Sequence, residues 1–516
     1  MRAVGGITIA GNVPVAIRQL FVRHGWLCAI FAIYLYAFPY FPRIHSANEL
    51  PRAYLVQAIV EDHTFAIDRQ VRGLGATADV SPYDGHQYSN KAPGSSLLVV
   101  PFYAVVRWIH GTPSLAATMW LCRIVGGVVP AVLFLWLLWG FLARFADEPV
   151  RRLAIVAYAL GSMAMTYAIL FYSHQLAAVC IASAWILALD VIDRRRGLVA
   201  MLAVGALAGA APLVDYQAAF AGVPIAVYVI VRLAQTRLAE LGLAVAYVMG
   251  GAAVPIAILF AYHWACFGSP TRTGYDVSQT FAVYHQHGFL GITALRWQAF
   301  YGSLLSADNG LVTLAPWWLL AIPGGVVLWR RGERGLVIAS AAVAVVLVLF
   351  VSSINFWRGG WGVGPRYITA MQPFLLPLVA AALDAWRGRP LAIGAAAGLV
   401  VPAVVIYCAS AATFPYWPDS VGNPLYDITF RLLRDGAVAP NLGAACGISG
   451  LLGLVPYVAL VGGLVGWTIV RASSGRGLAL ALALGAVILA AFALVPHGGA
   501  AAEHAYSVVR PAVAAW

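Results

Sequence analysis

The sequence predicts an all-α, polytopic membrane protein. Its 516 residues are 62% hydrophobic and only 10% charged, whereas soluble domains carry about 25% charged and 45–50% apolar residues. Apolar runs long enough to cross a bilayer, about 20 residues each, recur along the chain. These observations exclude a soluble globular enzyme, a disordered protein and a disulfide-stabilised scaffold, and the length allows roughly a dozen membrane helices.

Thirteen apolar segments are expected to cross the membrane. The first, Trp26–Tyr40, follows Arg2, Arg18 and Arg23 with no acidic residue before it, so we predict a retained signal anchor that enters from the cytoplasm. Pro93–Trp108 is too short to span, and we expect a juxtamembrane or re-entrant helix there. The other twelve spans are expected at 117–143, 151–171, 175–191, 197–213, 217–233, 238–263, 311–329, 335–353, 367–385, 391–410, 450–470 and 477–496.

The loops between these segments alternate in charge. Short loops rich in arginine are expected in the cytoplasm, because positive residues are retained there during insertion. The long loops 43–93, 264–310 and 411–449 then fall on the opposite face. These arginines explain the net charge of +12, so no nucleic-acid partner is expected. The arginine-rich loops contain Arg144, Arg151 and Arg152; Arg194–Arg196; Arg232 and Arg237; Arg330, Arg331 and Arg334; Arg387 and Arg389; and Arg471 and Arg476.

The first long loop contains a candidate phosphate ligand. All 32 basic residues are arginine except Lys91. An ammonium group acts as a compact point charge on a phosphate, whereas a guanidinium is a planar fork. We interpret Lys91 as a phosphate ligand where the loop meets the membrane; the alternative is chance in an arginine-biased sequence. Asp84-Gly85 is typical of a turn, and His86 and Tyr88 beside it are either substrate contacts or structural residues of the loop.

The same loop contains a candidate general base. Glu49 and Arg52 have the i, i+3 spacing that puts two side chains on one helical face. Transfer of a phosphate-activated group needs a carboxylate to deprotonate the acceptor and cations to stabilise the departing phosphate. The alternative is an exposed ion pair that contributes little energy.

Together these features are similar to those of the GT-C superfamily, the membrane glycosyltransferases that use polyprenyl-phosphate sugars. The resemblance covers the first 215 residues: a hydrophobic first helix, a carboxylate with an arginine three residues later, a long outer loop and the turn at 88–94. The bacterial branch of lipid A aminoarabinose transferases and protein O-mannosyltransferases is the most similar. Further similar segments are 267–270, 309–311 with Pro316, and 359–367.

The resemblance implies an inverting hexosyl- or pentosyltransferase. Its donor would be a polyprenyl-phosphate sugar, and its acceptor a hydroxyl of a lipid, glycan or protein. Glu49 takes the place of the catalytic carboxylate, Arg52 of its neighbouring arginine, and Lys91 of the phosphate-binding lysine. Because the family usually has Asp where this chain has Glu49, Asp62 and Asp84 are alternative bases.

The implied architecture is a GT-C-like bundle of about 13 transmembrane helices with juxtamembrane helices in its first outer loop. We expect a catalytic module at 1–410, with that loop at 43–93, followed by the last outer loop and the last two helices at 411–516, and no separate soluble domain. The high Ala, Gly and Arg content indicates a bacterial source. The expected location is therefore the inner (cytoplasmic) membrane, with the N-terminus in the cytoplasm, the active site facing the periplasm or cell exterior, and membrane lipids as further partners.

Four more polar residues are predicted at the outer face. Arg366 begins an expected helix after a glycine-rich segment, a position that suits a donor phosphate; the alternative is an interfacial Arg/Trp anchor. Tyr367 follows it as a substrate-binding candidate. Asp215 lies between two apolar runs, where ionisable residues are functional candidates, and His174 lies at another outer helix end. Both are assigned to substrate binding, although an interfacial hydrogen-bonding role is the alternative for His174.

No cofactor is expected with certainty. A divalent metal is not favoured because the chain has no DxD motif, and no GxGxxG or GxxxxGK[ST] loop indicates nucleotide binding. One alternative function is a lipid-linked oligosaccharide ligase or polymerase, which would depend on His174 and Arg366 and not on Glu49. A second is a flippase or transporter, which predicts charged residues at the bilayer midplane.

Overall fold

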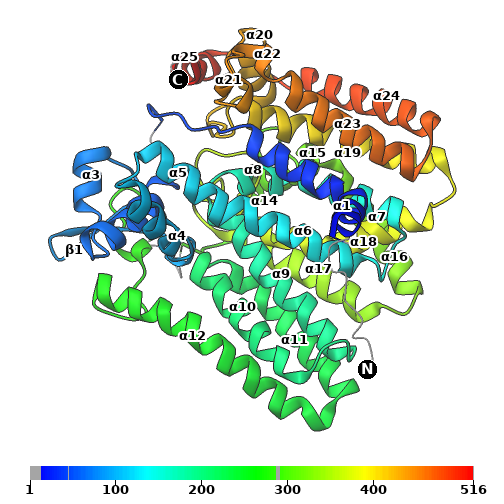
Figure 1. Cartoon of the computed structure of the whole chain (residues 1–516), viewed down its shortest axis with the longest axis horizontal. Coiled ribbons are helices and arrows are strands. Elements are labelled where there is room, and N and C mark those ends of the chain that lie inside the picture. Colours follow the sequence, from blue (N-terminus) through cyan, green and yellow to red (C-terminus); the bar gives the residue numbers. More distant parts are fainter. Residues whose placement is uncertain (1–12, 45, 286–290, 515–516) are drawn as a thin grey trace, which may run out of the picture.

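The computed structural model describes residues 13–44, 46–285 and 291–514, and this part of the chain is mostly helical (Figure 1). Nine candidate membrane spans in the described residues are long and apolar enough to cross a bilayer. The prediction of a multi-pass, all-α membrane protein is therefore confirmed. The nine are Leu115–Leu142 (α5, η2 and α6), Ser173–Ile192 (α9), Ala218–Thr236 (α11), Leu238–Phe267 (η4 and α12), Arg334–Ser353 (α17), Arg366–Ala385 (η7 and α18), Pro390–Ala412 (α19), Val455–Ala472 (α23) and Gly475–Leu494 (α24 and η9).

The remaining expected spans are short, bent or broken, so the count of thirteen is not confirmed. α7 (Glu148–Leu160) and α8 (Met163–Ile169) form one candidate span that bends by 54° between them. The apolar helices His24–Tyr36, within α1 (Val13–Tyr36), and Leu198–Val214, which joins η3 to α10 (Met201–Val214), are shorter than a full span. Arg2, one of the arginines before the first run, lies outside the described residues.

The expected span 311–329 is not a single helix. α15 (Leu311–Leu314) ends before Pro316, and the chain continues as η6 (Pro316–Leu320) and α16 (Ala321–Arg330). Proline has no N–H to donate to the preceding turn, and it disfavours a helical conformation in the residue before it. The apolar composition of this segment therefore predicted a continuous span, whereas the structure has three short elements there.

Glycines allow close contacts between neighbouring helices. α10 packs against α12 (Leu241–Phe267) in the lower part of Figure 1. A Cβ atom on Gly251 of α12 would lie 1.9 Å from the carbonyl oxygen of Leu202, and one on Gly205 would lie 2.0 Å from that of Val248. In the same way, a Cβ on Gly324 of α16 would lie 1.7 Å from the carbonyl oxygen of Leu378 in α18 (Gln372–Ala385). These positions accept no larger side chain without movement of the backbone.

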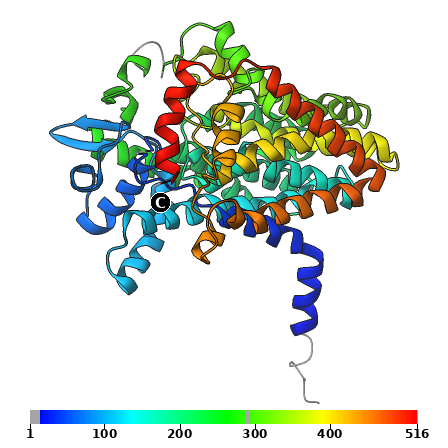
Figure 2. The same ribbon diagram turned by 90° about the horizontal axis from the view of Figure 1, so that it is seen from above.

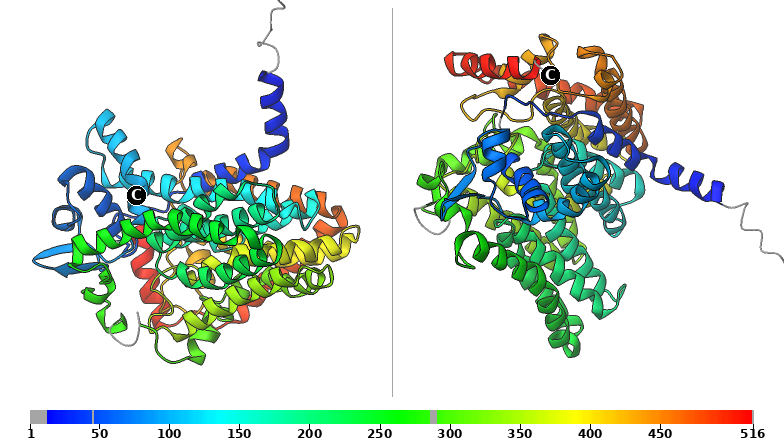
Figure 3. Two further views of the ribbon diagram at one scale, coloured as in Figure 1. Left: turned by 90° about the horizontal axis from the view of Figure 1, so that it is seen from below. Right: turned by 60° about the vertical axis from the view of Figure 1, so that its left-hand side comes forward.

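The C-terminal helices pack on the N-terminal part of the bundle. α23 contacts α1 and α7, and α24 (Gly475–Ala491) lies along α19. The hydroxyl of Tyr36 donates to the carbonyl oxygen of Gly453 at 2.6 Å, and an isolated bridge joins Ala37 to Asn441. The start of α1 projects away from the bundle in Figure 2 and in both views of Figure 3. The division of the chain at residue 410 stays a prediction, and these contacts bind its two parts together.

The first outer loop folds into short elements beside the bundle. α2 (Leu50–Gln57), η1 (Ala58–Asp62) and α3 (Asp68–Leu74) precede a hairpin of β1 (Val80–Tyr83) and β2 (His86–Ser89). Asp84 and Gly85 have φ of 49° and 78° at its turn, the backbone that a two-residue hairpin with a right-handed twist requires.

α4 (Gly94–His110) follows the hairpin as the expected short helix. It leaves Leu98, Phe102, Val105 and Trp108 exposed, so an apolar stripe runs along one side of it. That stripe fits a helix at the membrane surface, as the sequence predicts.

The arginine-rich loops gather at one end of the bundle. Arg144 pairs with Asp190 and with Asp193, the latter at 2.9 Å, and Arg387 pairs with Asp147. Arg331 donates to the carbonyl oxygen of Phe145 at 3.2 Å and pairs with Asp384 at 3.0 Å. The long loops meet near Ser173 at the other end of α9. The predicted separation of the two kinds of loop is therefore present in the fold.

Candidate functional site

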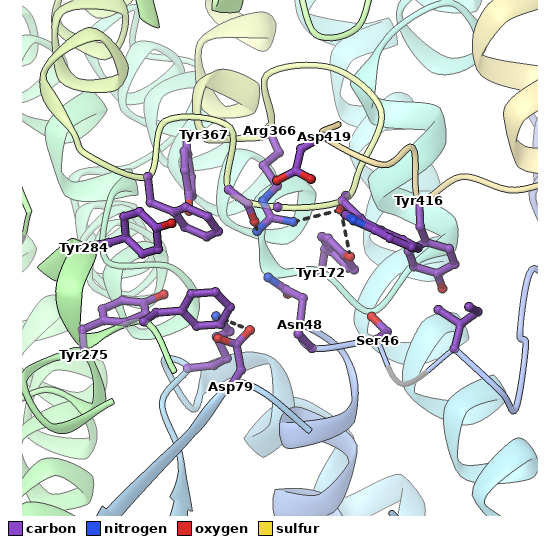
Figure 4. A pocket seen from close by; sticks show the side chains of 18 of the residues that line it. Ser46, Asn48, Asp79, Tyr172, Tyr275, Tyr284, Arg366, Tyr367, Tyr416 and Asp419 are labelled. Atoms are coloured by element: carbon purple, nitrogen blue, oxygen red, sulfur yellow. Dashed lines mark hydrogen bonds and ion pairs between the residues drawn. The ribbon is translucent and has the colours of Figure 1, made fainter. Parts of the chain in front are cut away.

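A cavity of about 530 Å³ lies where the three long outer loops meet. Aromatic side chains occupy opposite sides of it, with Tyr275, Tyr284 and Tyr367 on one side and Tyr416 on the other (Figure 4). Ligand pockets typically enclose about 300–1,000 Å³ and combine apolar walls with a few polar groups. The first loop contributes Arg43, Ile44, Ser46–Asn48, Asp79 and Lys91; the 264–310 loop contributes Tyr275, Phe281 and Tyr284; and the rest of the wall is Tyr172, Phe356, Gly359–Trp361, Arg366, Tyr367, Tyr416 and Asp419.

Lys91 lies in the wall of this cavity. It follows β2, which positions it beside Asp79 at the start of the hairpin, and its Nζ is 2.8 Å from Asp79 Oδ2. The amide of Asn90 donates to the other Asp79 oxygen at 3.0 Å. Burial lowers the pKa of Lys91 to about 8, although Asp79 opposes this change. Lys91 therefore carries its charge at neutral pH but loses it in mildly alkaline solution.

Arg366 forms a second buried cation in the wall. Its side chain donates to the carbonyl oxygens of Gly359 and Trp361, and its Nε is buried without a hydrogen-bond partner. A Cβ on Gly359, whose φ is 73°, would lie 2.5 Å from Arg366 Nε, so the glycine permits this approach. Among the described residues, no carboxylate lies within 4 Å of Arg366. The residue is only 6% exposed, and its charge is thus buried without an ion pair.

The expected residues Arg52, His174 and Asp215 form one buried network behind the wall. Arg52 donates to Asn48, which lines the cavity, and to Ser173 Oγ at 2.7 Å. His174 Nδ1 lies 2.6 Å from Asp215 Oδ2, and Gln217 also donates to that oxygen, at 3.0 Å. Burial alone would raise the pKa of Asp215, but His174 and Arg52 outweigh it and hold the value below the usual range. The network therefore supports the cavity wall from behind, through Asn48, and its three residues do not line the cavity themselves.

Glu49 is enclosed behind the cavity. It is 0% exposed, and its carboxylate receives two bonds from Arg123, at 2.9 and 3.0 Å. The backbone N–H of Phe171 donates to the same carboxylate at 2.7 Å, and the hydroxyl of Tyr416 donates at 2.6 Å. Each Glu49 oxygen thus accepts two hydrogen bonds, one of them from a buried cation. Glu49 is not among the residues that line the cavity, although Tyr416, which donates to it, is one of them.

The other first-loop candidates also lie outside the cavity wall. Asp62 pairs with Arg69 at 2.8 Å near solvent, and Asp84 is exposed at the hairpin turn. His86 is exposed and lies 3.0 Å from Asp68, while Tyr88 packs edge-on against Phe267. Of the predicted site residues, Lys91, Arg366 and Tyr367 line the cavity.

The structure adds residues that the sequence analysis did not single out. Asp79 and Asp419 are carboxylates in the cavity wall, and Arg123 is the partner of Glu49. Asp79 lies twelve residues before Lys91 in a loop already noted for its phosphate ligand, so a hairpin prediction could have paired them. The pairing of Glu49 with Arg123 spans 74 residues, and no local pattern indicates it.

A small pocket of about 60 Å³ adjoins the cavity, and the polar residues Asp215, Gln217 and Asn355 line it together with aromatic side chains. The two share Tyr275, Tyr284, Phe356 and Tyr367. The pocket continues to Phe220 of α11 (Ala218–Thr236) and Phe350 of α17 (Arg334–Ser353), whose rings stack at 4.6 Å between centroids. The cavity thus continues into a pocket whose far wall is formed by two candidate membrane spans that pack against each other.

Across 13–44, 46–285 and 291–514, no group of three or more His, Cys, Asp or Glu side chains is placed to hold an ion.

Comparison with known proteins gives similarities of fold. No family model and no curated protein sequence matches the chain. The solved structure of ArnT from Cupriavidus metallidurans bound to undecaprenyl phosphate is 16% identical, with a TM-score of 0.49 over 94% of this chain and 78% of that one. Archaeal oligosaccharyltransferase AglB from Archaeoglobus fulgidus, in complex with an inhibitory peptide and a dolichol-phosphate, is 11% identical, with a TM-score of 0.44 over 85% and 60%. Arabinosyltransferase EmbB from Mycobacterium smegmatis is 12% identical, with a TM-score of 0.44 over 95% and 44%.

Proposed function

We propose that this chain is a membrane glycosyltransferase that moves a sugar from a polyprenyl-phosphate donor to an acceptor hydroxyl at the non-cytoplasmic face of a bacterial inner membrane. The observation that carries the proposal is the buried charge of Arg366, which faces the cavity with Lys91 and has no ion pair in the described residues. A buried charge without a counter-ion is costly. A phosphate between Arg366 and Lys91 supplies that counter-ion.

The shape of the cavity supports a lipid-linked donor. Its polar part holds the two cations, and the adjoining pocket, which is largely aromatic, reaches Phe220 and Phe350 on candidate membrane spans. The phosphate would bind Lys91 and Arg366, the first part of the prenyl chain would lie in the adjoining pocket against Phe220 and Phe350, and the sugar would lie against the tyrosines. Arg52, His174 and Asp215 position this wall, and Arg52 does so through Asn48.

The acceptor hydroxyl would attack the anomeric carbon as the bond from that carbon to the phosphate oxygen breaks. The phosphate leaves with the bonding electrons, and the hydroxyl proton passes to a carboxylate. Asp79 is 2.8 Å from Lys91, so it lies beside the leaving phosphate and holds the lysine. We assign the base to Asp419, which lines the cavity and is exposed. Its carbonyl oxygen accepts from Arg358 at 3.0 Å, whereas its carboxylate has no hydrogen bond or ion pair with the described residues.

A binding experiment tests the phosphate site. Purified protein is mixed with polyprenyl phosphate, and the retained lipid is measured by native mass spectrometry in the wild type, Lys91→Ala and Arg366→Gln. Arg69→Gln, an exposed arginine of the first loop, is the matched control. We expect both cavity variants to lose the lipid and the control to retain it. Equal retention in all four proteins refutes the phosphate site, and retention of bulk phospholipid alone favours the transporter alternative.

A turnover experiment separates the candidate bases. Consumption of a polyprenyl-phosphate sugar is followed in membranes that contain the wild type, Asp419→Asn or Glu49→Gln. We expect Asp419→Asn to retain donor binding and lose at least about 100-fold in rate, the lower end of general-base contributions. Full activity in Asp419→Asn moves the base to another carboxylate, and full activity in every carboxylate variant favours the ligase alternative.

A further inference from the structure

A groove of about 460 Å³ lies at the end of the bundle opposite the cavity. It runs between α6 (Val129–Leu142) and α9. α9 begins at Ser173, beside the network behind the cavity, and ends at Ile192, beside the groove. Its 20 residues span about 30 Å at 1.5 Å per residue, which matches the hydrocarbon thickness of a bilayer. The groove therefore lies at the other face of the membrane.

The groove combines an apolar wall with a basic rim. Trp136 and Gly140 of α6 line the wall, and Arg144, Arg195 and Arg196 line the rim. Trp136 is 61% exposed, and Leu133, one turn earlier on α6, is 62% exposed. An apolar track therefore leads from the arginines towards the centre of the membrane.

Positive charge exceeds negative charge at this end. Arg144 pairs with both Asp190 and Asp193, and weaker pairs join Arg196 to Asp190 at 3.5 Å and Arg232 to Asp193 at 3.9 Å. Among the described residues, Arg194 and Arg195 have no carboxylate within 4 Å. This group thus has five positive charges and two negative ones, the latter on Asp190 and Asp193. The arginines are Arg144, Arg194, Arg195, Arg196 and Arg232.

We propose that this groove binds one anionic phospholipid, with its phosphodiester headgroup on Arg195 and Arg196 and one acyl chain along Trp136 and Leu133. Basic pockets between membrane helices recognise acidic headgroups, and the excess charge favours an anionic lipid over a zwitterionic one. Each rim arginine contributes about fivefold to affinity, and the pair contributes roughly thirtyfold. The proposal does not depend on the proposed reaction.

A lipid titration tests the charge requirement. The full chain in detergent is titrated with phosphatidylglycerol or with phosphatidylcholine of the same acyl chains, and bound lipid is measured by native mass spectrometry. We expect phosphatidylglycerol to bind more tightly, and an Arg195→Gln/Arg196→Gln variant to lose roughly thirtyfold in affinity. Arg471→Gln/Arg476→Gln removes two exposed arginines elsewhere and is expected to bind as the wild type does. Equal affinity for the two lipids overturns the proposal.

A second variant tests the groove without changing its charge. A Cβ on Gly140 meets no atom within 4 Å, so Gly140→Leu fills the groove without displacing the backbone. Gly463 of α23 is equally open, and Gly463→Leu is the matched control. We expect Gly140→Leu alone to weaken phosphatidylglycerol binding. Unchanged phosphatidylglycerol binding in Gly140→Leu overturns the proposal. A variant that loses a dimer instead of bound lipid also overturns it, because the groove would then be a contact between two copies of the chain.

Discussion

Replacing Glu49 with glutamine distinguishes a structural carboxylate from a catalytic one. The change keeps the side-chain shape but removes the charge that Arg123 faces at 2.9 and 3.0 Å in a site that is 0% exposed. Removing one partner of a buried ion pair typically costs about 3–5 kcal/mol, because the other charge is left uncompensated. The glutamine NH₂ group would also face the N–H of Phe171 or the hydroxyl of Tyr416, which now donate to the carboxylate. We therefore expect a loss in stability at the upper part of that range.

The assay is thermal unfolding of the detergent-purified protein, followed by loss of the monodisperse peak in size-exclusion chromatography. Asp62→Asn is the matched control, because Asp62 pairs with Arg69, whose side chain is 57% exposed, and such pairs contribute about 0–1 kcal/mol. A double variant, Glu49→Leu/Arg123→Leu, removes both charges and is expected to recover much of the lost stability. Wild-type stability in Glu49→Gln together with lost sugar transfer would refute the structural reasoning and restore Glu49 as the base.

Three further predictions concern packing, pH and the network behind the cavity. Gly251→Ala is expected to lower the stability of the α10–α12 pair by about 1–3 kcal/mol or more, because its Cβ would lie 1.9 Å from a backbone oxygen. Gly250→Ala is the control: the nearest atom to its Cβ is a flexible methyl at 3.7 Å, so alanine is expected to stabilise the helix by about 0.5–1 kcal/mol. Thermal unfolding compares the two variants. Polyprenyl-phosphate affinity, measured from pH 7 to 9.5, is expected to fall about tenfold per pH unit above pH 8, where Lys91 loses its proton. The free energy of unfolding, in contrast, is expected to rise with pH between about 8 and 10.5, because in this range Lys91 is protonated in the unfolded chain but not in the folded one. An affinity that does not change with pH would contradict the role of Lys91. Asp215→Asn is expected to destabilise the protein, because the Asp215 carboxylate lies 2.6 Å from His174 Nδ1 and accepts from Gln217 at 3.0 Å; unchanged unfolding would contradict its role in the network behind the cavity.

Features set by local chemistry were predictable from the sequence. Hydropathy located the spans because each bilayer crossing needs its own apolar run, and the glycines before Arg366 marked a close backbone approach. The partner of Glu49 was not predictable, because periodicity relates Glu49 to Arg52 but says nothing about Arg123. The break at Pro316 was visible as a residue, yet the apolar run around it indicated a continuous span. Asp419 lies far along the chain from Lys91, and only the folded loops bring both to one cavity.

The bonds around Glu49 also set an order of events during synthesis. Glu49 and Arg123 enter the membrane early, whereas Tyr416 follows Arg123 by 293 residues. At about 5–20 residues per second, translation of that stretch takes roughly 15–60 s. Throughout this interval the nascent chain holds a charged pair that lacks its tyrosine donor and the cover of the last outer loop. The bonds around Glu49 are therefore completed only when the 411–449 loop has been synthesised, and a chain truncated before it would lack the Tyr416 donor.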